Sequence, residues 1–190
     1  MIRRRIIFVL VVWMSLSSFG GCASFRWGDT EPPASWPLSK GQGKQSISLL
    51  LIGASPYIEG LEESAAKAYK ESGLFSDVKT RASETDLRAE VDVSMSRSET
   101  SESDVYVPVL TLFLFPIIQR NEIVLRTTLK NKEGQELGVV EKKDGYTELD
   151  GLLMIFFMPF KWPNTIESNL LYDLNRATIS QANDEGLFQP

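Results

Sequence analysis

The chain has 190 residues, one cysteine, no histidine, and 25 acidic against 20 basic side chains, for a net charge of −5. The lack of histidine excludes histidine-based catalysis and histidine-ligated metal sites, and a lone cysteine cannot form an intramolecular disulfide. The acidic balance argues against nucleic acid, which requires a basic face. We therefore expect no nucleic-acid partner and no cofactor.

Residues 1–21 have the three parts of a secretory signal peptide. Three arginines (3–5) form a positive head, residues 6–16 form an apolar run broken only by Ser15, and residues 17–21 (SSFGG) are mostly small. An apolar run of about 11 residues is too short for a membrane-spanning helix, which needs roughly 20. We predict that residues 1–21 are removed from the mature chain. That removal takes away basic side chains only and makes the mature chain more acidic.

The stretch Phe19-Gly20-Gly21-Cys22 resembles the lipobox of bacterial lipoproteins, in which a small residue precedes a cysteine. The resemblance implies cleavage between Gly21 and Cys22 and a thioether bond from the Cys22 sulfur to diacylglycerol, with acyl chains of the palmitate type. Because each buried methylene contributes about 0.8 kcal/mol, two or three acyl chains anchor a protein stably. Ala23, in place of an aspartate, implies sorting to the outer membrane. The expected location is therefore the bacterial envelope, with the lipid anchor in the outer membrane and the domain facing the periplasm or, as the alternative, the cell surface.

Residues 22–44 are predicted to be a lipidated, extended tether, because they contain three prolines and three glycines and show no apolar periodicity. Trp27 and Trp36 either lie at the lipid headgroups or pack back on the folded part. Residues 45–190 are predicted to form a single α+β domain.

This domain begins with an apolar run, 46–52, that is typical of a buried strand. Ser55 as N-cap and Pro56 at the first helical position predict a helix that ends at Gly73. A short strand around Val78 is expected next.

The second half of the domain is predicted to consist of strands and a final helix. Apolar residues alternate with polar ones over 89–96, which predicts a half-exposed strand, and the residues that follow, 96–104, read as a solvated loop. Residues 123–130 and 137–141 flank a glycine-containing turn and predict a β-hairpin. Asn164 and Glu167 form a capping box that begins the second helix. The expected fold is a two-layer α+β sandwich of order β-α-β-β-β-β-α, with a mostly antiparallel sheet and both helices on one face.

Two apolar segments, 105–118 and 151–160, are too short to span a bilayer as helices. They are core segments, an exposed surface for a protein partner or an oligomer, or segments that dip into the membrane. The candidate partner or membrane contacts are Leu112, Phe113, Phe115, Phe156, Phe157, Phe160 and Trp162.

The sequence indicates no catalytic constellation. Ser55 has no histidine to activate it, and the neighbouring carboxylates of Glu62 and Glu63 would point apart on a helix. We therefore expect a non-enzymatic protein.

The function expected from the sequence is that of a lipid-anchored binding or assembly component of the envelope. The order of elements loosely resembles that of the lipopolysaccharide-assembly lipoprotein, which would imply support of an outer-membrane partner through the sheet and the apolar segments. A self-oligomerising structural lipoprotein, similar in plan to ring-forming secretion-channel lipoproteins, and a carrier of lipid or another small molecule are the alternatives.

Overall fold

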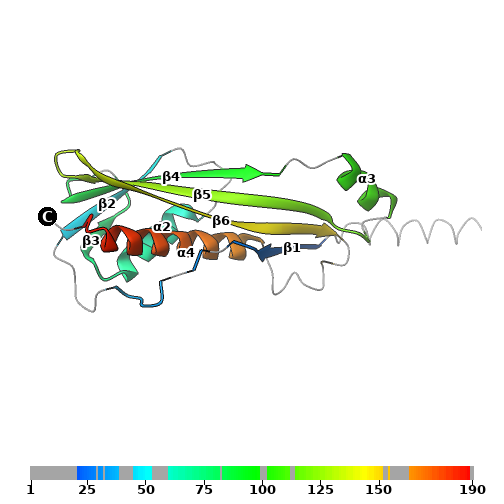
Figure 1. Ribbon diagram of the computed structural model, residues 1–190, viewed down its shortest axis with the longest axis horizontal. Helices are drawn as coiled ribbons and strands as arrows, with labels where there is room; N and C mark the ends of the chain where they lie inside the picture. The colour runs from blue at the N-terminus through cyan, green and yellow to red at the C-terminus, as the bar shows by residue number, and fades with distance from the viewer. Residues whose placement is uncertain are drawn as a thin grey trace, which may run out of the picture. The chain divides into compact units, whose positions relative to one another are not determined.

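The computed structural model describes residues 21–28, 30–31, 33–38, 45–52, 60–81, 83–98, 102–111, 114–151, 154 and 163–188. Six strands form one sheet in the order β1-β6-β5-β4-β2-β3, and with the helices they make an α+β fold, as predicted (Figure 1). The elements in chain order are β1 (Gly21–Arg26), β2 (Gln45–Ile52), α2 (Leu61–Glu71), β3 (Phe75–Lys79), β4 (Leu87–Arg97), α3 (Glu102–Leu110), β5 (Ile117–Asn131), β6 (Glu136–Gly151) and α4 (Pro163–Asp184).

The sheet is mixed. Strand β2 pairs in parallel with both β3 and β4, and β1 pairs antiparallel with β6. Strands β4 and β5 are antiparallel, because the Ser98 N–H donates to the Arg120 carbonyl while Lys130 contacts Glu90 farther along. Strands β5 and β6 form the predicted hairpin around Gly134, whose φ of 83° suits its turn. The parallel pair β2–β3 follows from the helix between them, which returns the chain to the starting edge.

The chain divides into two compact units. Unit 1 comprises Met1–Arg26, Arg97–Asn121 and Tyr146–Ile166, and unit 2 comprises Trp27–Ser96, Glu122–Gly145 and Glu167–Pro190. The sequence had predicted one domain over residues 45–190.

Helices α2 and α4 pack against each other in unit 2. The Ser64 hydroxyl donates to the Ser168 carbonyl at 3.4 Å, and the Lys67 ammonium lies 5.0 Å from the centre of the Tyr172 ring. The apolar face of α4, with Leu170, Leu171 and Leu174 fully buried, is the one that the sequence predicted. The two helices therefore share one layer (Figure 1).

The observed element ends agree in part with the predicted ones. Gly73 has the left-handed φ of 73° expected after the end of α2. The described part of α2 begins at Leu61 after a left-handed Gly60, and Ser55 and Pro56 lie outside the described residues. Helix α4 begins at Pro163, so Asn164 lies inside the helix and is not its cap, because proline is well suited to a first helical position.

Strand β4 has the predicted alternation, with Ala89, Val91 and Val93 buried between exposed or half-buried polar residues. Strand β2 is less uniformly buried than predicted. Ile47 and Leu49 are buried, but Ile52 is 42% exposed. Helix α3 occupies part of the predicted solvated loop and of the first apolar segment.

The predicted tether has regular structure and contacts. Residues 21–26 form strand β1, which pairs with β6 from Gly21 opposite Gly151 to Arg26 opposite Tyr146. Beyond β1, the Trp27 N–H donates to the Gly145 carbonyl at 3.0 Å and the Leu38 N–H donates to the Ser72 carbonyl at 3.0 Å. Trp27 and Leu38, which follow β1 in the chain, are therefore each held by a backbone hydrogen bond within unit 2.

Candidate functional site

Cys22, the predicted lipid attachment point, lies in β1 opposite Asp150 and is half-buried. Gly21, the other residue at the predicted cleavage site, lies opposite Gly151, the last residue of β6. Among the predicted contact residues, Phe115 is described and is 62% exposed. The others, Leu112, Phe113, Phe156, Phe157, Phe160 and Trp162, lie outside the described residues.

A row of hydrogen-bonded side chains in unit 1 connects Cys22 on β1 to three other strands, β6, β5 and β4. The Cys22 thiol donates to Glu148 Oε1 at 3.1 Å, and the Asn121 amide donates to Glu148 Oε2 at 3.4 Å. The Arg97 Nε–H in turn donates to Asn121 Oδ1 at 3.2 Å. Asn121 is fully buried, so its partners satisfy a polar group that water cannot reach. The row fixes the positions of the strand segments that carry Cys22, Glu148, Asn121 and Arg97.

The surroundings of Cys22 are acidic. Burial, followed by hydrogen bonding and repulsion from Asp150 and Glu148, raises the pKa of the Cys22 thiol far above its usual range. The thiolate is the reactive form of cysteine, so an unmodified thiol here would be a poor nucleophile. Oxygen and sulfur atoms of Cys22, Glu148 and Asp150 lie within 4.8 Å of one another. Thiolate ligation of a metal requires loss of the proton, which the two carboxylates oppose.

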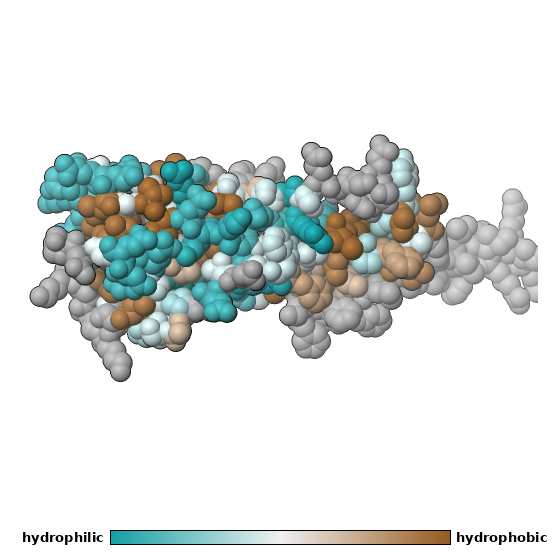
Figure 2. All heavy atoms as spheres, viewed as in Figure 1, coloured by the Kyte–Doolittle hydropathy of each residue, from teal (hydrophilic) through white to brown (hydrophobic). Residues whose placement is uncertain are grey.

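An exposed apolar surface lies on α3 and the residues after it. We call it the α3 surface; it consists of Tyr106, Val107, Val109, Leu110, Leu114, Phe115 and Ile118, each at least half exposed. Figure 2 shows apolar side chains at the end of the view where Figure 1 shows α3. These exposures contradict the core interpretation for the described part of segment 105–118. They agree with the membrane interpretation and with the partner interpretation, both of which require an exposed surface.

Cys22 and α3 lie at the same end of the sheet in unit 1. Strand β1 starts opposite the last residue of β6, and Asn121 near the start of β5 contacts Glu148 near the end of β6. The Ser98–Arg120 hydrogen bond of 2.8 Å places the end of β4 beside the start of β5. Since α3 connects these two strand ends, it leaves the sheet where β1 begins.

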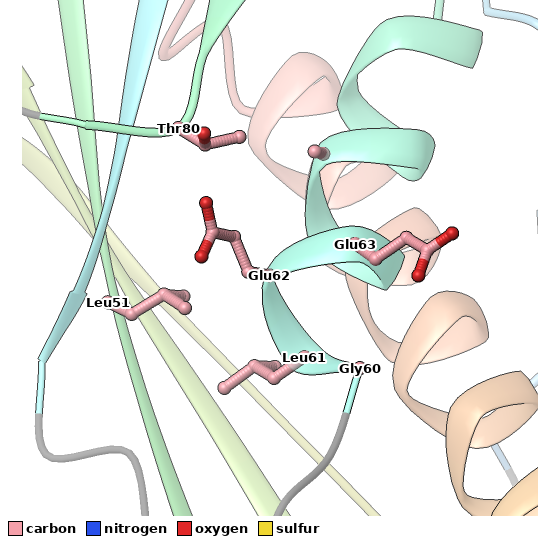
Figure 3. A pocket seen from close by; sticks show the side chains of 7 residues that line it. Leu51, Gly60, Leu61, Glu62, Glu63 and Thr80 are labelled. Atoms are coloured by element: carbon pink, nitrogen blue, oxygen red, sulfur yellow. The ribbon is translucent and has the colours of Figure 1, made fainter.

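A shallow hollow in unit 2 is the structural counterpart of the carrier hypothesis. Its volume is about 490 Å³, and it is lined by Leu51, Gly60, Leu61, Glu62, Glu63, Ala66 and Thr80. Figure 3 shows the Glu62 carboxylate directed toward Leu51 and Thr80 and the Glu63 carboxylate directed away. The two carboxylates therefore point apart, as predicted, and do not converge on a common substrate position.

A stack of aromatic and basic side chains in unit 2 involves Trp36, one of the two tryptophans with two predicted positions. The Arg176 guanidinium lies 4.9 Å from the Trp36 ring centre and 5.5 Å from that of Tyr172. The Tyr172 hydroxyl donates to Glu71. Burial, followed by this hydrogen bond and the charge of Glu71, raises the pKa of Tyr172 to about 12. Trp36 thus packs on unit 2.

Sequence reasoning identified Cys22 from a local motif but missed Arg97, Asn121 and Glu148. These residues lie on three different strands and carry no local signal. Only the strand order brings them into one row. Within the described residues, no helix is long and apolar enough to cross a membrane.

No protein-family profile and no curated protein matches the chain. Similar solved structures include a PelC dodecamer from Paraburkholderia phytofirmans, with 13% identity, a TM-score of 0.38, and coverage of 84% of this chain and 97% of that one. The rare lipoprotein B from Shewanella oneidensis has 14% identity, a TM-score of 0.39 and coverage of 76% and 99%. A minor lipoprotein from Acinetobacter baumannii has 10% identity, a TM-score of 0.35 and coverage of 78% and 91%. Bacterial lipoproteins are thus among the structures that this chain resembles at low identity.

Proposed function

We propose that the protein is a lipid-anchored, non-enzymatic component of the bacterial envelope that binds or assembles with other envelope components. The observation that carries the proposal is Cys22. It follows a charged head, a short apolar run and Gly20-Gly21, and it is the first residue that would remain after cleavage. Its side chain is half-buried, and it lies at an end of the sheet.

The chemistry of the titratable groups supports a non-enzymatic role. Perturbed pKa values cluster at catalytic sites, but here they are dispersed. Among the described residues, the pKa is raised at Cys22, Tyr69 and Tyr172 and lowered at Asp86. The four groups lie on β1, α2 and α4 and just before β4, and none of them lines the hollow of Figure 3.

The anchor would hold unit 1 close to the membrane. After the proposed cleavage, pairing with β6 would begin at Cys22, opposite Asp150, so no spacer would separate the acyl chains from the sheet. Ala23 and Ser24, the next two residues, are fully buried. Unit 1 would therefore lie at the membrane surface. The lipobox resemblance and Ala23 imply that this is the outer membrane, and we propose that the protein faces the periplasm.

A self-oligomerising structural lipoprotein is the second candidate, and the observation in its favour is the α3 surface. Exposed apolar patches of this kind mark interaction sites.

Metabolic labelling with tritiated palmitate tests the proposal. The full-length chain and a Ser17→Ala control, altered outside FGGC, should take up label and migrate at the processed size. Cys22→Ala should take up none and accumulate as the larger precursor, because Cys22 is the only residue with a thiol. An unlabelled wild-type chain, or a Cys22→Ala chain processed to the same size, would overturn the proposal.

A further inference from the structure

The α3 surface is the largest run of exposed apolar side chains in the described part of unit 1. Leu110 is 80% exposed, Phe115 62% and Tyr106 61%. Residues 105–118 contain no charged side chain, whereas Asp104 and Arg120 lie just outside that range. A run that is both charge-free and exposed needs a partner that removes it from water.

The exposed residues of α3 lie on one side of the helix. At about 100° per residue, Tyr106, Val107, Val109 and Leu110 fall within one broad arc. Pro108, which is buried, falls on the opposite side. Helix α3 has nine residues, so it is far too short to cross a bilayer and suits an orientation in the plane of an interface.

The position of α3 points to the bilayer as the occupant. Helix α3 leaves unit 1 at the sheet end where β1 starts, and β1 starts at the anchored cysteine. Arg97 and Arg120, both exposed, bracket α3 at the adjoining strand ends. Arginines beside an apolar helix face, with a tyrosine on that face, are typical of an interfacial segment that meets lipid phosphates and acyl chains together.

A second copy of the chain is the less favoured occupant. A stable protein interface buries about 800 Å² per partner and involves roughly 20–30 residues on each side. The α3 surface alone offers fewer side chains than that.

We propose that the α3 surface docks in the interfacial layer of the same bilayer that holds the acyl chains of Cys22, as a second, non-covalent membrane contact of unit 1. This inference rests on the proposed lipid anchor. Because no spacer separates the acyl chains of Cys22 from the sheet, the apolar side chains of the α3 surface would lie within reach of the bilayer and would be removed from water there.

The test uses the full-length, processed protein in vesicles of phosphatidylethanolamine and phosphatidylglycerol. A lipidated Cys22 has no free thiol, so Leu110→Cys supplies one thiol for an environment-sensitive fluorophore. Leu137→Cys on β6 in unit 2 makes the same exchange at a partly exposed leucine and serves as the control. Treatment of the unsubstituted protein with the same fluorophore tests the anchor separately, because only a Cys22 without lipid has a thiol that can react.

We expect the label at Leu110→Cys to emit at shorter wavelength, to be quenched by nitroxide-bearing lipids and to be shielded from aqueous iodide. The label at Leu137→Cys should emit at longer wavelength, should not be quenched by nitroxide-bearing lipids and should be quenched by aqueous iodide. Iodide quenching at both positions would overturn the docking proposal while leaving the anchor intact. Shielding at Leu110→Cys without nitroxide quenching would assign the surface to a second copy. Labelling of the unsubstituted protein at Cys22 would instead refute the anchor.

Discussion

Paired leucine truncations measure whether the α3 surface belongs to the core. Leu125 on β5 is fully buried, and Leu110 on α3 is 80% exposed. Leu125→Ala should lower the free energy of unfolding by about 2–5 kcal/mol, the range for buried leucines that leave a cavity. Leu110→Ala removes side-chain atoms that are already in water, so its effect should stay within about 0.5 kcal/mol.

Urea unfolding of the mature chain, followed by circular dichroism, gives both values, and the midpoint should shift without a change in slope. In a thermal scan, each kcal/mol should lower Tm by roughly 2–4 °C for a chain of this size. The reasoning is refuted if Leu110→Ala destabilises as strongly as Leu125→Ala. That result would mean that segment 105–118 is a core segment and that the α3 surface is not available for docking.

Three further predictions concern the polar row, the aromatic stack and its pH dependence. Asn121→Ala should lower the free energy of unfolding by about 1–3 kcal/mol, because Glu148 Oε2 loses its amide donor and the Arg97 Nε–H loses its acceptor; an unchanged urea midpoint would contradict this role of Asn121. Trp36→Ala should cost about 0.5–2 kcal/mol of cation–π interaction with Arg176 and speed proteolysis within residues 33–38, whereas unchanged cleavage would show that the stack does not hold this segment. Because the pKa of Tyr172 is raised from about 10 to about 12, the contribution of Tyr172 to stability should be fully present below pH 10 and be lost between pH 10 and 12. Glu71→Gln should move the phenolate absorbance of Tyr172 to lower pH, and an unmoved titration would refute the role of Glu71.

The elements predicted well from the sequence are those whose signal is local. The alternation in β4, the glycine after α2, the turn at Gly134 and the apolar face of α4 each depend on residues close together in the chain. Local patterns of this kind identify a strand, a turn or a helix face without reference to the rest of the fold.

Strand β1 and helix α3 could not be predicted in this way. Strand β1 is short, precedes a proline- and glycine-rich stretch, and owes its conformation to pairing with residues more than a hundred positions away. Helix α3 contains Pro108 and four valine or tyrosine residues, which favour strands more than helices. An apolar run of 10 to 14 residues is also ambiguous, because hydrophobicity alone does not distinguish a buried segment from an exposed one.

The candidate site also has one part that could be predicted from local sequence and one part that could not. Cys22 is recognisable from its neighbours in sequence, whereas its acidic surroundings depend on the pairing of β1 with β6. The placement of α3 at the same end of unit 1 depends on the order of four strands. The sequence therefore identifies the attachment point, and the fold supplies the surface beside it.

The most direct test of the account is the mass of the N-terminal peptide of the mature protein, isolated from membranes. The account predicts that this peptide begins at Cys22 and carries diacylglycerol on its sulfur. A peptide that retains residues 1–21, or one that begins elsewhere with Cys22 open to alkylation, would contradict it.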